Sequence, residues 1–177
     1  MPDHTLISMS LSPAIPPPRR LRHKVRIRHA SPEEAYSLLS RIPELRPMSP
    51  FDAFRERLVS AQALLLVAEA DNNLAGCKVG YDVGEQEFYS WLGGVLPPYR
   101  RCGIAAILLR EQERILAESG YRSVGVKSVR PASAMQLLLQ KEGYACVGIE
   151  TASRGDKLLF EKQLPPVHLP ELLPLDI

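Results

Sequence analysis

The segment Trp91–Ala105 constrains the fold more than any other part of this sequence. A strand-like run, Phe88–Val95, ends there in glycines and prolines, and apolar residues then recur at helical spacing over Ile104–Gly120. A second strand-like run follows at Ser123–Val129. Because a strand, a crossover helix and another strand form a right-handed unit, we expect the two strands to run parallel in one sheet.

The rest of the chain completes a mixed sheet. Asp71-Asn72-Asn73 joins two short apolar runs, which is typical of a β-hairpin, and Asp82–Gln86 makes a second turn. Ser31-Pro32-Glu33-Glu34 predicts a helix start through its capping serine, first-turn proline and acids. The predicted fold class is α+β (mixed α/β), with about six to seven strands, an antiparallel N-terminal meander, a parallel pair and about four helices. Further strands are expected at Val25–Arg28, Leu64–Ala70, Leu74–Tyr81, Ala145–Glu150 and Lys157–Lys162, and further helices at Ser49–Ser60 and Ser133–Glu142.

Proline marks the edges of the predicted domain. Five prolines precede Lys24 and four follow Gln163, of sixteen in the chain. Proline removes a backbone donor and fixes φ, so such stretches resist helix and sheet. We predict a proline-rich basic tail at 1–23, one domain at 24–163 and a proline- and leucine-rich tail at 164–177. The basic cluster at 19–24 either contacts a phosphate or is solvated. The C-terminal tail packs on a neighbouring surface or on a second subunit.

Charge and hydropathy exclude several classes of protein. A formal net charge of +2 is too small to make nucleic acid the main partner. The longest apolar runs, Leu64–Ala68 and Ile104–Leu109, are far too short to span a membrane. Met1–Ser12 has no positively charged start followed by an apolar block, so we expect no secretory signal.

The cysteines and histidines do not suggest a metal centre. The cysteines are odd in number and share no metal-type spacing, which fits free thiols in a reducing cytoplasm. The histidines avoid the predicted core, so metal chemistry and histidine-based triads are not expected. These residues are Cys77, Cys102, Cys146, His4, His23, His29 and His168.

The junction before the predicted helix has the composition of an anion site. The first amides of a helix have no partners within it, and together with the helix dipole they suit a pyrophosphate. Gly103 and Ala105 would let an anion approach the backbone, and Arg100 and Arg101 add positive charge. The alternative is a plain strand-to-helix turn with two surface arginines. The position between a strand and an amphipathic helix favours phosphate binding.

At this junction the sequence resembles the GNAT superfamily of acyl-CoA-dependent N-acyltransferases. That family carries the signature V-x-P-x-x-R-x-x-G-x-G/A, and Val95, Pro97, Arg100, Gly103 and Ala105 fill its fixed positions. The resemblance covers 25–162 in the order of elements and implies the GNAT fold. It extends to a group of bacterial members of unsettled substrate, which share a Y-S-W-x-x-G-V-x-P approach and a later K-T/S…A-M…L-L-x-K-x-G-F/Y block. The matching residues are Tyr89-Ser90-Trp91, Lys127-Ser128, Ala134-Met135, Leu138-Leu139, Lys141 and Gly143-Tyr144.

The resemblance implies that acetyl-CoA is the co-substrate, and we expect no metal. The backbone of Val95 and Leu96 would hydrogen-bond the pantetheine arm as an added strand, and an amide near Leu96 would polarise the thioester carbonyl. Gly93-Gly94 would form a bulge that splays the two parallel strands. The residues implied to wrap the pyrophosphate are Arg100, Arg101, Cys102, Gly103, Ile104 and Ala105.

Direct attack on a thioester requires a neutral amine, so some group must accept a proton from it. Glu87 and Tyr89 are the catalytic candidates, with Glu87 acting through water; otherwise Glu87 is an exposed residue at the strand entry. Tyr89 and Trp91 either shape the acceptor pocket or pack in the core. Glu44 either binds a charged substrate or lies on the surface.

The later helix departs from the family pattern L-Y-x-K-x-G-F. Leu139 stands where the family has a tyrosine that often protonates the leaving thiolate, and Arg130 or Ala132 replaces the usual asparagine. Water or another group would then protonate the thiolate, or the enzyme is slow, or it has lost activity.

The leading hypothesis is a cytoplasmic N-acetyltransferase that moves an acetyl group from acetyl-CoA to a primary amine of a small molecule or a protein. Because superfamily members often dimerise, a homodimer is expected. The second hypothesis is an acyl-CoA-binding regulatory module with the same fold and little or no turnover, which Leu139 favours. The third, a nucleic-acid-binding protein, lacks a helix-turn-helix or an aromatic-basic sheet pattern. The sequence does not indicate the acceptor.

Overall fold

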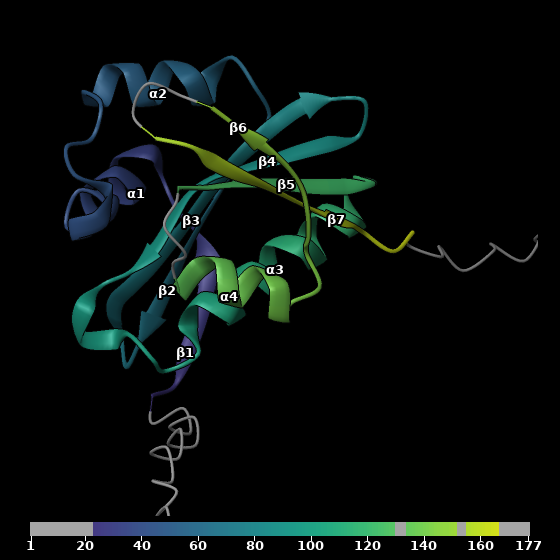
Figure 1. Cartoon of the computed structure of the whole chain (residues 1–177). Coiled ribbons are helices and arrows are strands. Elements are labelled where there is room, and N and C mark those ends of the chain that lie inside the picture. The colour runs from purple at the N-terminus through teal and green to yellow at the C-terminus, as the bar shows by residue number, and fades with distance from the viewer. Residues whose placement is uncertain (1–22, 130–133, 152–154, 167–177) are drawn as a thin grey trace, which may run out of the picture.

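The computed structural model describes residues 23–129, 134–151 and 155–166. The strands are β1 (Val25–His29), β2 (Ala63–Ala70), β3 (Asn73–Gly84), β4 (Glu87–Val95), β5 (Ser123–Val129), β6 (Ala145–Glu150) and β7 (Lys157–Gln163); the helices are α1 (Pro32–Leu39), α2 (Phe51–Val59), α3 (Ile104–Glu118) and α4 (Ala134–Lys141), with 3₁₀ turns η1 (Pro43–Leu45) and η2 (Pro97–Tyr99). Within these residues the strands form a seven-stranded sheet in the order β1-β2-β3-β4-β5-β7-β6. Helices α1 and α2 lie on one face and α3 and α4 on the other (Figure 1). The predicted mixed α/β fold is confirmed.

Strands β1 to β4 form the predicted antiparallel meander. Its two hairpin turns each contain two consecutive residues with positive φ, Asp71-Asn72 at 49° and 66° and Glu85-Gln86 at 54° and 63°. Two left-handed residues match the twist of tight hairpins, which explains why polar residues occupy these positions. Strand β3 continues to Gly84, beyond the predicted end at Tyr81.

Strands β4 and β5 run parallel, as predicted, but they pair over only four residues each. The paired stretch joins Glu87–Ser90 to Ser123–Val126. Beyond it, β4 continues beside β3 and β5 continues beside β7. The two parallel strands therefore separate at their C-terminal ends, and the splay implied by the family resemblance is present.

The bulge in β4 lies at Trp91, where the register between β3 and β4 shifts by one residue. The prediction that Gly93-Gly94 forms the bulge is wrong, because both glycines pair regularly with β3. Gly94 instead permits close packing against the segment between α1 and η1, since a Cβ there would lie 2.8 Å from Cδ1 of Ile42. The glycines are explained by proximity to neighbouring side chains and not by an irregular backbone.

Two hydrophobic cores lie on opposite faces of the sheet. Each helix turns one apolar stripe toward the strands, and each large side chain so buried contributes about 1.5–3 kcal/mol. Leu164, just beyond β7, is also buried, and its amide donates to the Arg122 carbonyl at 2.7 Å. The α3 side contains Phe88, Ile104, Leu108, Leu109, Leu116, Val124, Leu139 and Phe160, and the α1 side contains Leu38, Leu39, Ile42, Phe54, Leu58, Val67 and Val79.

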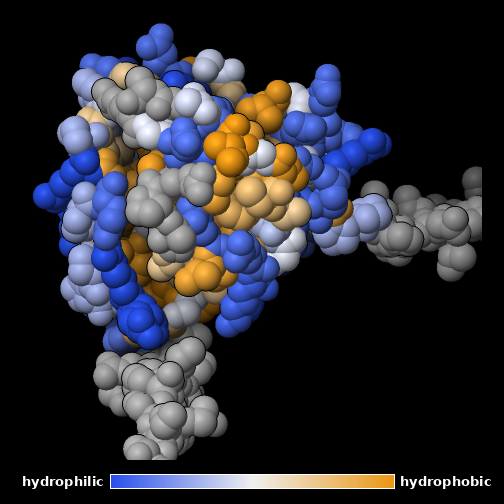
Figure 2. Space-filling model, in the orientation of Figure 1, coloured by the Kyte–Doolittle hydropathy of each residue, from blue (hydrophilic) through white to orange (hydrophobic). Residues whose placement is uncertain are grey.

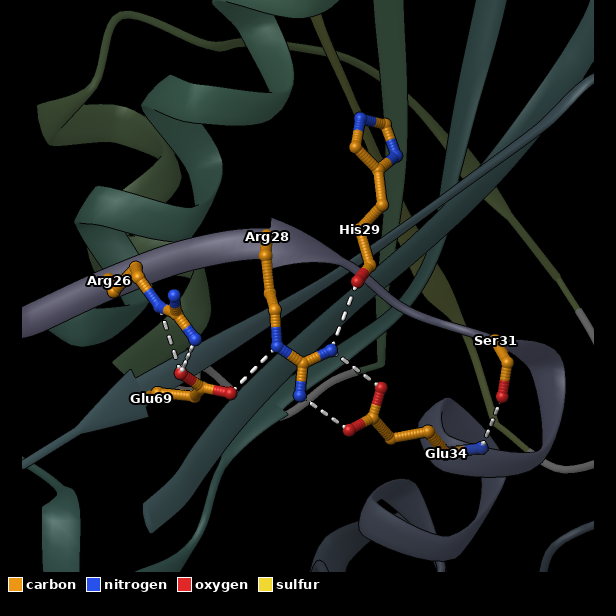
Figure 3. Close-up of polar contacts among 6 residues, drawn as sticks. All are labelled: Arg26, Arg28, His29, Ser31, Glu34 and Glu69. Carbon is orange, nitrogen blue, oxygen red and sulfur yellow. Dashed lines mark hydrogen bonds and ion pairs between the residues drawn. The ribbon is translucent and has the colours of Figure 1, made fainter. Parts of the chain in front are cut away.

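The start of α1 is fastened to the sheet by polar contacts, as Figure 3 shows. The Ser31 hydroxyl accepts from the Glu34 amide at 3.2 Å. The Arg28 guanidinium on β1 donates to the Glu34 carboxylate at 2.6 and 2.8 Å and to Glu69 on β2 at 2.7 Å. Hydrogen bonds from Arg28 hold the pKa of Glu34 below its usual range. The predicted capping serine is confirmed, and the arginine adds a link between helix and sheet.

Candidate active site

One edge of β4 is open where the strand separates from β5. Ser90 is its last residue paired with β5, and the strand continues to Val95 beside β3. The Leu96 amide donates to the Ala75 carbonyl at 2.8 Å on the β3 side. Because successive backbone groups point to alternate sides, those of Val95 point to the open side. The gap can therefore accept an extended chain along β4 as a strand is added to a sheet edge.

The two residues expected to bind pantetheine have different partners. The Val95 carbonyl accepts from Nε of Arg100 at 3.0 Å. The Leu96 amide is engaged by Ala75, so that amide does not point at a carbonyl in the gap. The expected polarising role of the Leu96 amide thus has no support in this geometry.

The N-terminus of α3 lies open beside this edge. Gly103 precedes the helix with φ of 80°, makes no side-chain cap, and would have nothing within 4 Å of an added Cβ. Arg101 also has positive φ, 60°, and the first turn contains no acidic residue. Left-handed residues before a helix make a concave set of amides, and the helix dipole adds positive charge. The arrangement suits an anion such as a pyrophosphate.

Arg100 and Glu44, 56 positions apart in sequence, form a two-pronged ion pair in the structure. Nη1 and Nη2 of Arg100 lie 2.9 and 2.7 Å from the two oxygens of Glu44. Both side chains are more than a third exposed, so the pair is open to solvent. The pair joins η1 to the segment before α3, and the hydrogen bond lowers the pKa of the Glu44 carboxyl.

The other residues of the junction divide between surface and core. Arg101 is exposed, and the half-buried Cys102 thiol lies 3.4 Å from the Arg100 carbonyl. Ile104 is 1% exposed and anchors the helix in the α3-side core. Ala105 lines the gap beside Val95.

A narrow cavity of about 10 Å³ lies between the open edge of β4 and helices α3 and α4. It brings together the two motif segments that the sequence singled out. Of the described residues that line it, one has a charged side chain, Lys78 on β3. Its lining includes Lys78, Gly93, Val95, Ala105, Met135 and Leu138.

A larger open depression, of about 380 Å³, lies at the opposite end of α3. Its lining includes Phe88, Leu116, Gly120 and Tyr121. None of the residues 95–105 contributes to it, so we do not take it as the candidate site.

Trp91 lies on the α1 side of the sheet, within an aromatic cluster beneath α2. Its ring stacks on Phe54 with centroids 5.6 Å apart and meets Tyr81 edge-on at 5.7 Å. The Arg57 guanidinium lies 4.9 Å above the same ring. The indole is half-buried and at the bulge, so it borders the point where β4 and β5 separate.

Tyr89 shares this face and meets Tyr81 edge-on at 5.5 Å. The Lys127 ammonium lies 5.7 Å from its ring and is also paired with Glu150. Burial raises the pKa of Tyr89 to about 12. At neutral pH its hydroxyl is therefore a hydrogen-bond donor and not a base.

Glu87 is the first residue of β4 and is exposed. It lies in the part of the strand that is still paired with β5, opposite Ser123. It lies four positions before Trp91, roughly 13 Å along the strand. The structure thus brings Tyr89 and Trp91 to the splay and leaves Glu87 at a distance that water would have to bridge.

A core residue occupies the position where the family has a tyrosine. Leu139 is fully buried in the α3-side core. Tyr144, five residues later, is also buried, and burial raises the pKa of its phenol well above the usual range. The expected substitutions at Arg130 or Ala132 lie outside the described residues.

Sequence reasoning missed buried polar side chains of the core between the sheet and α3. Lys78 is 6% exposed, Ser90 3% and Gln112 0%. Neither the Ser90 hydroxyl nor the Gln112 amide has a hydrogen-bond partner among the described residues. The signal was available for Lys78, since it is the one charged residue in the apolar run Leu74–Tyr81.

Within residues 23–129, 134–151 and 155–166, no group of three or more histidine, cysteine or acidic side chains could hold a metal ion. Among the helices of the same residues, none is long and apolar enough to cross a membrane.

Comparisons with known proteins agree on one family. The acetyltransferase (GNAT) family model matches residues 32–144. No curated protein matches the sequence. The ribosomal-protein-S18-alanine N-acetyltransferase from Escherichia coli is similar in structure, with a TM-score of 0.69 and 14% identity over 85% of this chain and 99% of that chain.

Two further structures support the same fold. An IAA acetyltransferase from Bacillus cereus ATCC 14579 has a TM-score of 0.68 and 19% identity over 80% of this chain and 100% of that chain. A GNAT family acetyltransferase from Elizabethkingia anophelis with acetyl-CoA bound has a TM-score of 0.63 and 16% identity over 79% and 98%. At such identities the likeness concerns the fold alone.

Proposed function

The chain belongs to the GNAT family of acetyltransferases, and we propose that it acetylates a primary amine by direct attack on the thioester of acetyl-CoA. The observation that carries the proposal is the meeting of two open features, the unpaired edge of β4 and the uncapped start of α3. We assign the activity to one domain of residues 24–163, to which the buried Leu164 also belongs.

The chain's own residues fit acetyl-CoA, which acts as a substrate and supplies the thioester. The open side of Val95 provides backbone groups for the pantetheine amides. The amides of 103–106 and the positive end of α3 provide a site for the pyrophosphate. An added Cβ at Gly103 would meet no protein atom, so a phosphate could lie against this backbone.

We propose that the acceptor amine approaches from the α1 side, beneath α2. Trp91 and Tyr89 line that approach and border the splay. The amine must be neutral to attack, and Glu87 is our candidate to take its proton through water, since strand alternation places it on the face of Tyr89. The neutral Tyr89 hydroxyl would orient the nucleophile by donating or accepting a hydrogen bond.

A second candidate function is a CoA-binding regulatory module with little or no turnover. The observation that favours it is the buried Leu139 at the position of the usual general acid. The binding features of β4 and α3 would be the same in this case. Turnover alone separates the two functions.

The test is the release of CoA thiol from acetyl-CoA in the presence of a panel of small amines and peptides, with mass spectrometry of the products. Acceptor-dependent release together with an acetylated amine supports the enzyme. Tight acetyl-CoA binding without release for any acceptor supports the regulatory module. Absence of acetyl-CoA binding contradicts both.

We also propose a homodimer and a cytoplasmic location. Apolar side chains gather on the surface over β6 and α4 (Figure 2), the elements that carry Leu137, Val147 and Ile149, each more than half exposed. Strand β6 is an edge of the sheet, and an exposed apolar edge favours pairing with a second copy. The thiols Cys77, Cys102 and Cys146 are not in disulfides, which supports a reducing compartment. Sedimentation velocity, on wild type and on Val147→Lys, measures the oligomeric state.

A further inference from the structure

Lys78 is a buried cation that the binding and catalytic roles described so far do not use. It lies in the middle of β3, opposite Gly93 on β4, and is 6% exposed. Its side chain makes no hydrogen bond or ion pair with the described residues. A buried charge without a partner costs several kcal/mol, so its presence calls for an explanation.

The Lys78 side chain extends across β4 toward the splay. A Cβ added to Gly93 would lie 3.4 Å from Cγ of Lys78, so the lysine stem lies over this glycine. From there it lines the cavity that also contains Val95 of the open edge and Met135 and Leu138 of α4. The splay begins after Ser90, only three residues before Gly93. A thioester held along the open edge would therefore pass the Lys78 ammonium.

Among the described residues, few charged groups face Lys78. Glu113 on α3 and the Cys77 thiol on its own strand act on it through space, and Glu113 is itself paired with Lys162 at 2.6 Å. The neighbouring side chains from β2 and α4 are apolar. Burial lowers the pKa of Lys78 to about 8, and the attraction of Glu113 partly opposes that effect. The ammonium is thus mostly charged at neutral pH and gives up its proton readily.

We propose that Lys78 is the proton donor to the CoA sulfur, and that it fills the role left vacant by Leu139. This inference rests on the proposed acetyl transfer. Lys78 is then a catalytic residue, because its ammonium touches the leaving atom.

The step that we assign to Lys78 follows bond formation between the amine nitrogen and the thioester carbonyl carbon. The carbon–sulfur bond breaks, the sulfur leaves with the electron pair, and a proton moves from Nζ of Lys78 to the sulfur. The products are the acetylated amine, CoA thiol and neutral lysine. The proton lost by the attacking nitrogen goes to water or to the carboxylate base, and solvent returns a proton to Lys78 after product release.

The acidity of the two groups suits this transfer. An alkyl thiol such as that of cysteine has a pKa of about 8.5, close to that of Lys78 in this cavity. A proton donor whose pKa lies near that of the leaving group and near the working pH is efficient. An ordinary surface lysine, with a pKa of about 10.4, would be a weaker acid for the same step.

The experiment compares wild type with Lys78→Met, which keeps the length of the side chain and removes its charge. Lys24→Met, at an exposed position before β1, is the control for loss of a lysine charge. The first readout is the pKa of the thiol of enzyme-bound CoA, followed by the ultraviolet absorbance of the thiolate. The second is kcat, beside the Kd for acetyl-CoA, over about pH 6 to 10. Thermal melting confirms that each variant folds.

We expect the bound thiol to have a pKa lower by about one unit in wild type than in Lys78→Met. We expect kcat to fall about a hundredfold in this variant, with the Kd for acetyl-CoA nearly unchanged. The ratio of wild-type to variant rate should be greatest at neutral pH and fall as pH rises through about 8, where Lys78 loses its proton. Lys24→Met should match wild type in each readout.

Equal thiol pKa values in wild type and Lys78→Met would overturn the proposal, whatever the rates. If wild type binds CoA but acetylates no amine, the proposed function fails while the thiol titration still decides the position of Lys78. If the pKa of the bound thiol differs between wild type and Lys78→Met as expected but kcat is the same, Lys78 lies beside the sulfur without donating its proton. The proposed role is then wrong.

Discussion

Helices α1 and α3 begin against the same sheet, but their N-termini differ in capping: α1 has a side-chain cap and α3 has none. At α1, Ser31 caps the Glu34 amide, and Glu34 in turn is held by Arg28. At α3, Gly103 offers no side chain, the first turn has no acid, and arginines precede it. Both helices present unpaired amides and the positive end of a dipole.

In our proposal, this difference separates a helix start with a structural role from one that binds a ligand. The chain satisfies the start of α1 with its own serine and carboxylate, and Figure 3 shows that these groups tie the helix to β1 and β2. The start of α3 lies instead beside the open edge of β4, where its amides are available to an external anion. Changes at α1 should therefore alter stability alone, and changes at α3 should alter ligand affinity.

The largest expected effect on acetyl-CoA affinity comes from placing a carboxylate at the N-terminus of α3. Gly103→Glu should weaken acetyl-CoA binding at least about a hundredfold, because the new charge repels the pyrophosphate and occupies its place. Isothermal titration calorimetry measures the change.

Gly120→Glu is the matched control for this change. Gly120 follows the same helix, has φ of 86°, and also has nothing within 4 Å of an added Cβ. The two variants should lose similar stability from backbone strain, while Gly120→Glu keeps the affinity of wild type. Equal losses of affinity would show that strain, and not charge at the site, is responsible.

The next effect is on the stability of α1. Arg28→Ala should lower the melting temperature by about 5 °C at neutral pH, since Arg28 bridges two carboxylates at a partly solvated position. Its acetyl-CoA affinity should equal that of wild type. A loss of acetyl-CoA affinity in Arg28→Ala would contradict the separate roles that we give to the N-termini of α1 and α3.

The same variant has a defined pH dependence. The pKa of Glu34 is lowered in the folded state, chiefly by its hydrogen bonds with Arg28, from an ordinary value of 4.5. Its contribution to stability is therefore complete above that value and is lost as pH falls through the lowered folded pKa. The difference in melting temperature between wild type and Arg28→Ala should shrink in acid below pH 4.5. A constant difference would contradict the assignment to this ion pair.

Arg100 tests whether the ion pair with Glu44 competes with the ligand. Arg100→Ala should weaken acetyl-CoA about tenfold through loss of a cation beside α3. Glu44→Gln should strengthen binding by about twofold to threefold, because it removes the carboxylate that Arg100 neutralises. If Glu44→Gln weakens binding as much as Arg100→Ala does, the pair positions η1 and does not contact the phosphates.

The smallest effect should come from the cap of α1. Ser31→Ala should lower the free energy of unfolding by about 1 kcal/mol, because the Glu34 amide loses its acceptor. Urea denaturation measures this change, and Ser31→Asp, which restores a capping oxygen, should recover it. A Ser31→Ala protein as stable as wild type would show that the Ser31 hydroxyl does not stabilise α1.

Much of the fold was predictable because its signals are local. The strands Ser123–Val129 and Ala145–Glu150 agree with their predicted limits, since alternation and turn residues define them within a few positions. The parallel pairing followed from the crossover helix between Phe88–Val95 and Ser123–Val129. The open start of α3 was visible as a glycine in the place where α1 has a serine.

The features that were missed depend on contacts between distant segments. The bulge is at Trp91 and not at the glycines, and its position depends on the register of β4 against β3. The partner of Arg100 is Glu44, which no local pattern could indicate. Lys78 was missed although it is a charge in an apolar run, and its place in the cavity requires the register of β3 against β4. The surroundings of Trp91 likewise depend on how α2 packs over its ring.

The most direct test of the contrast between the two helix starts is a backbone amide NMR titration of the protein with acetyl-CoA. Our account predicts large shifts for the amides of 103–106 and for Val95 on the open edge, and none for the capped first turn of α1 around Glu34. Shifts at α1 without shifts at 103–106 would contradict it.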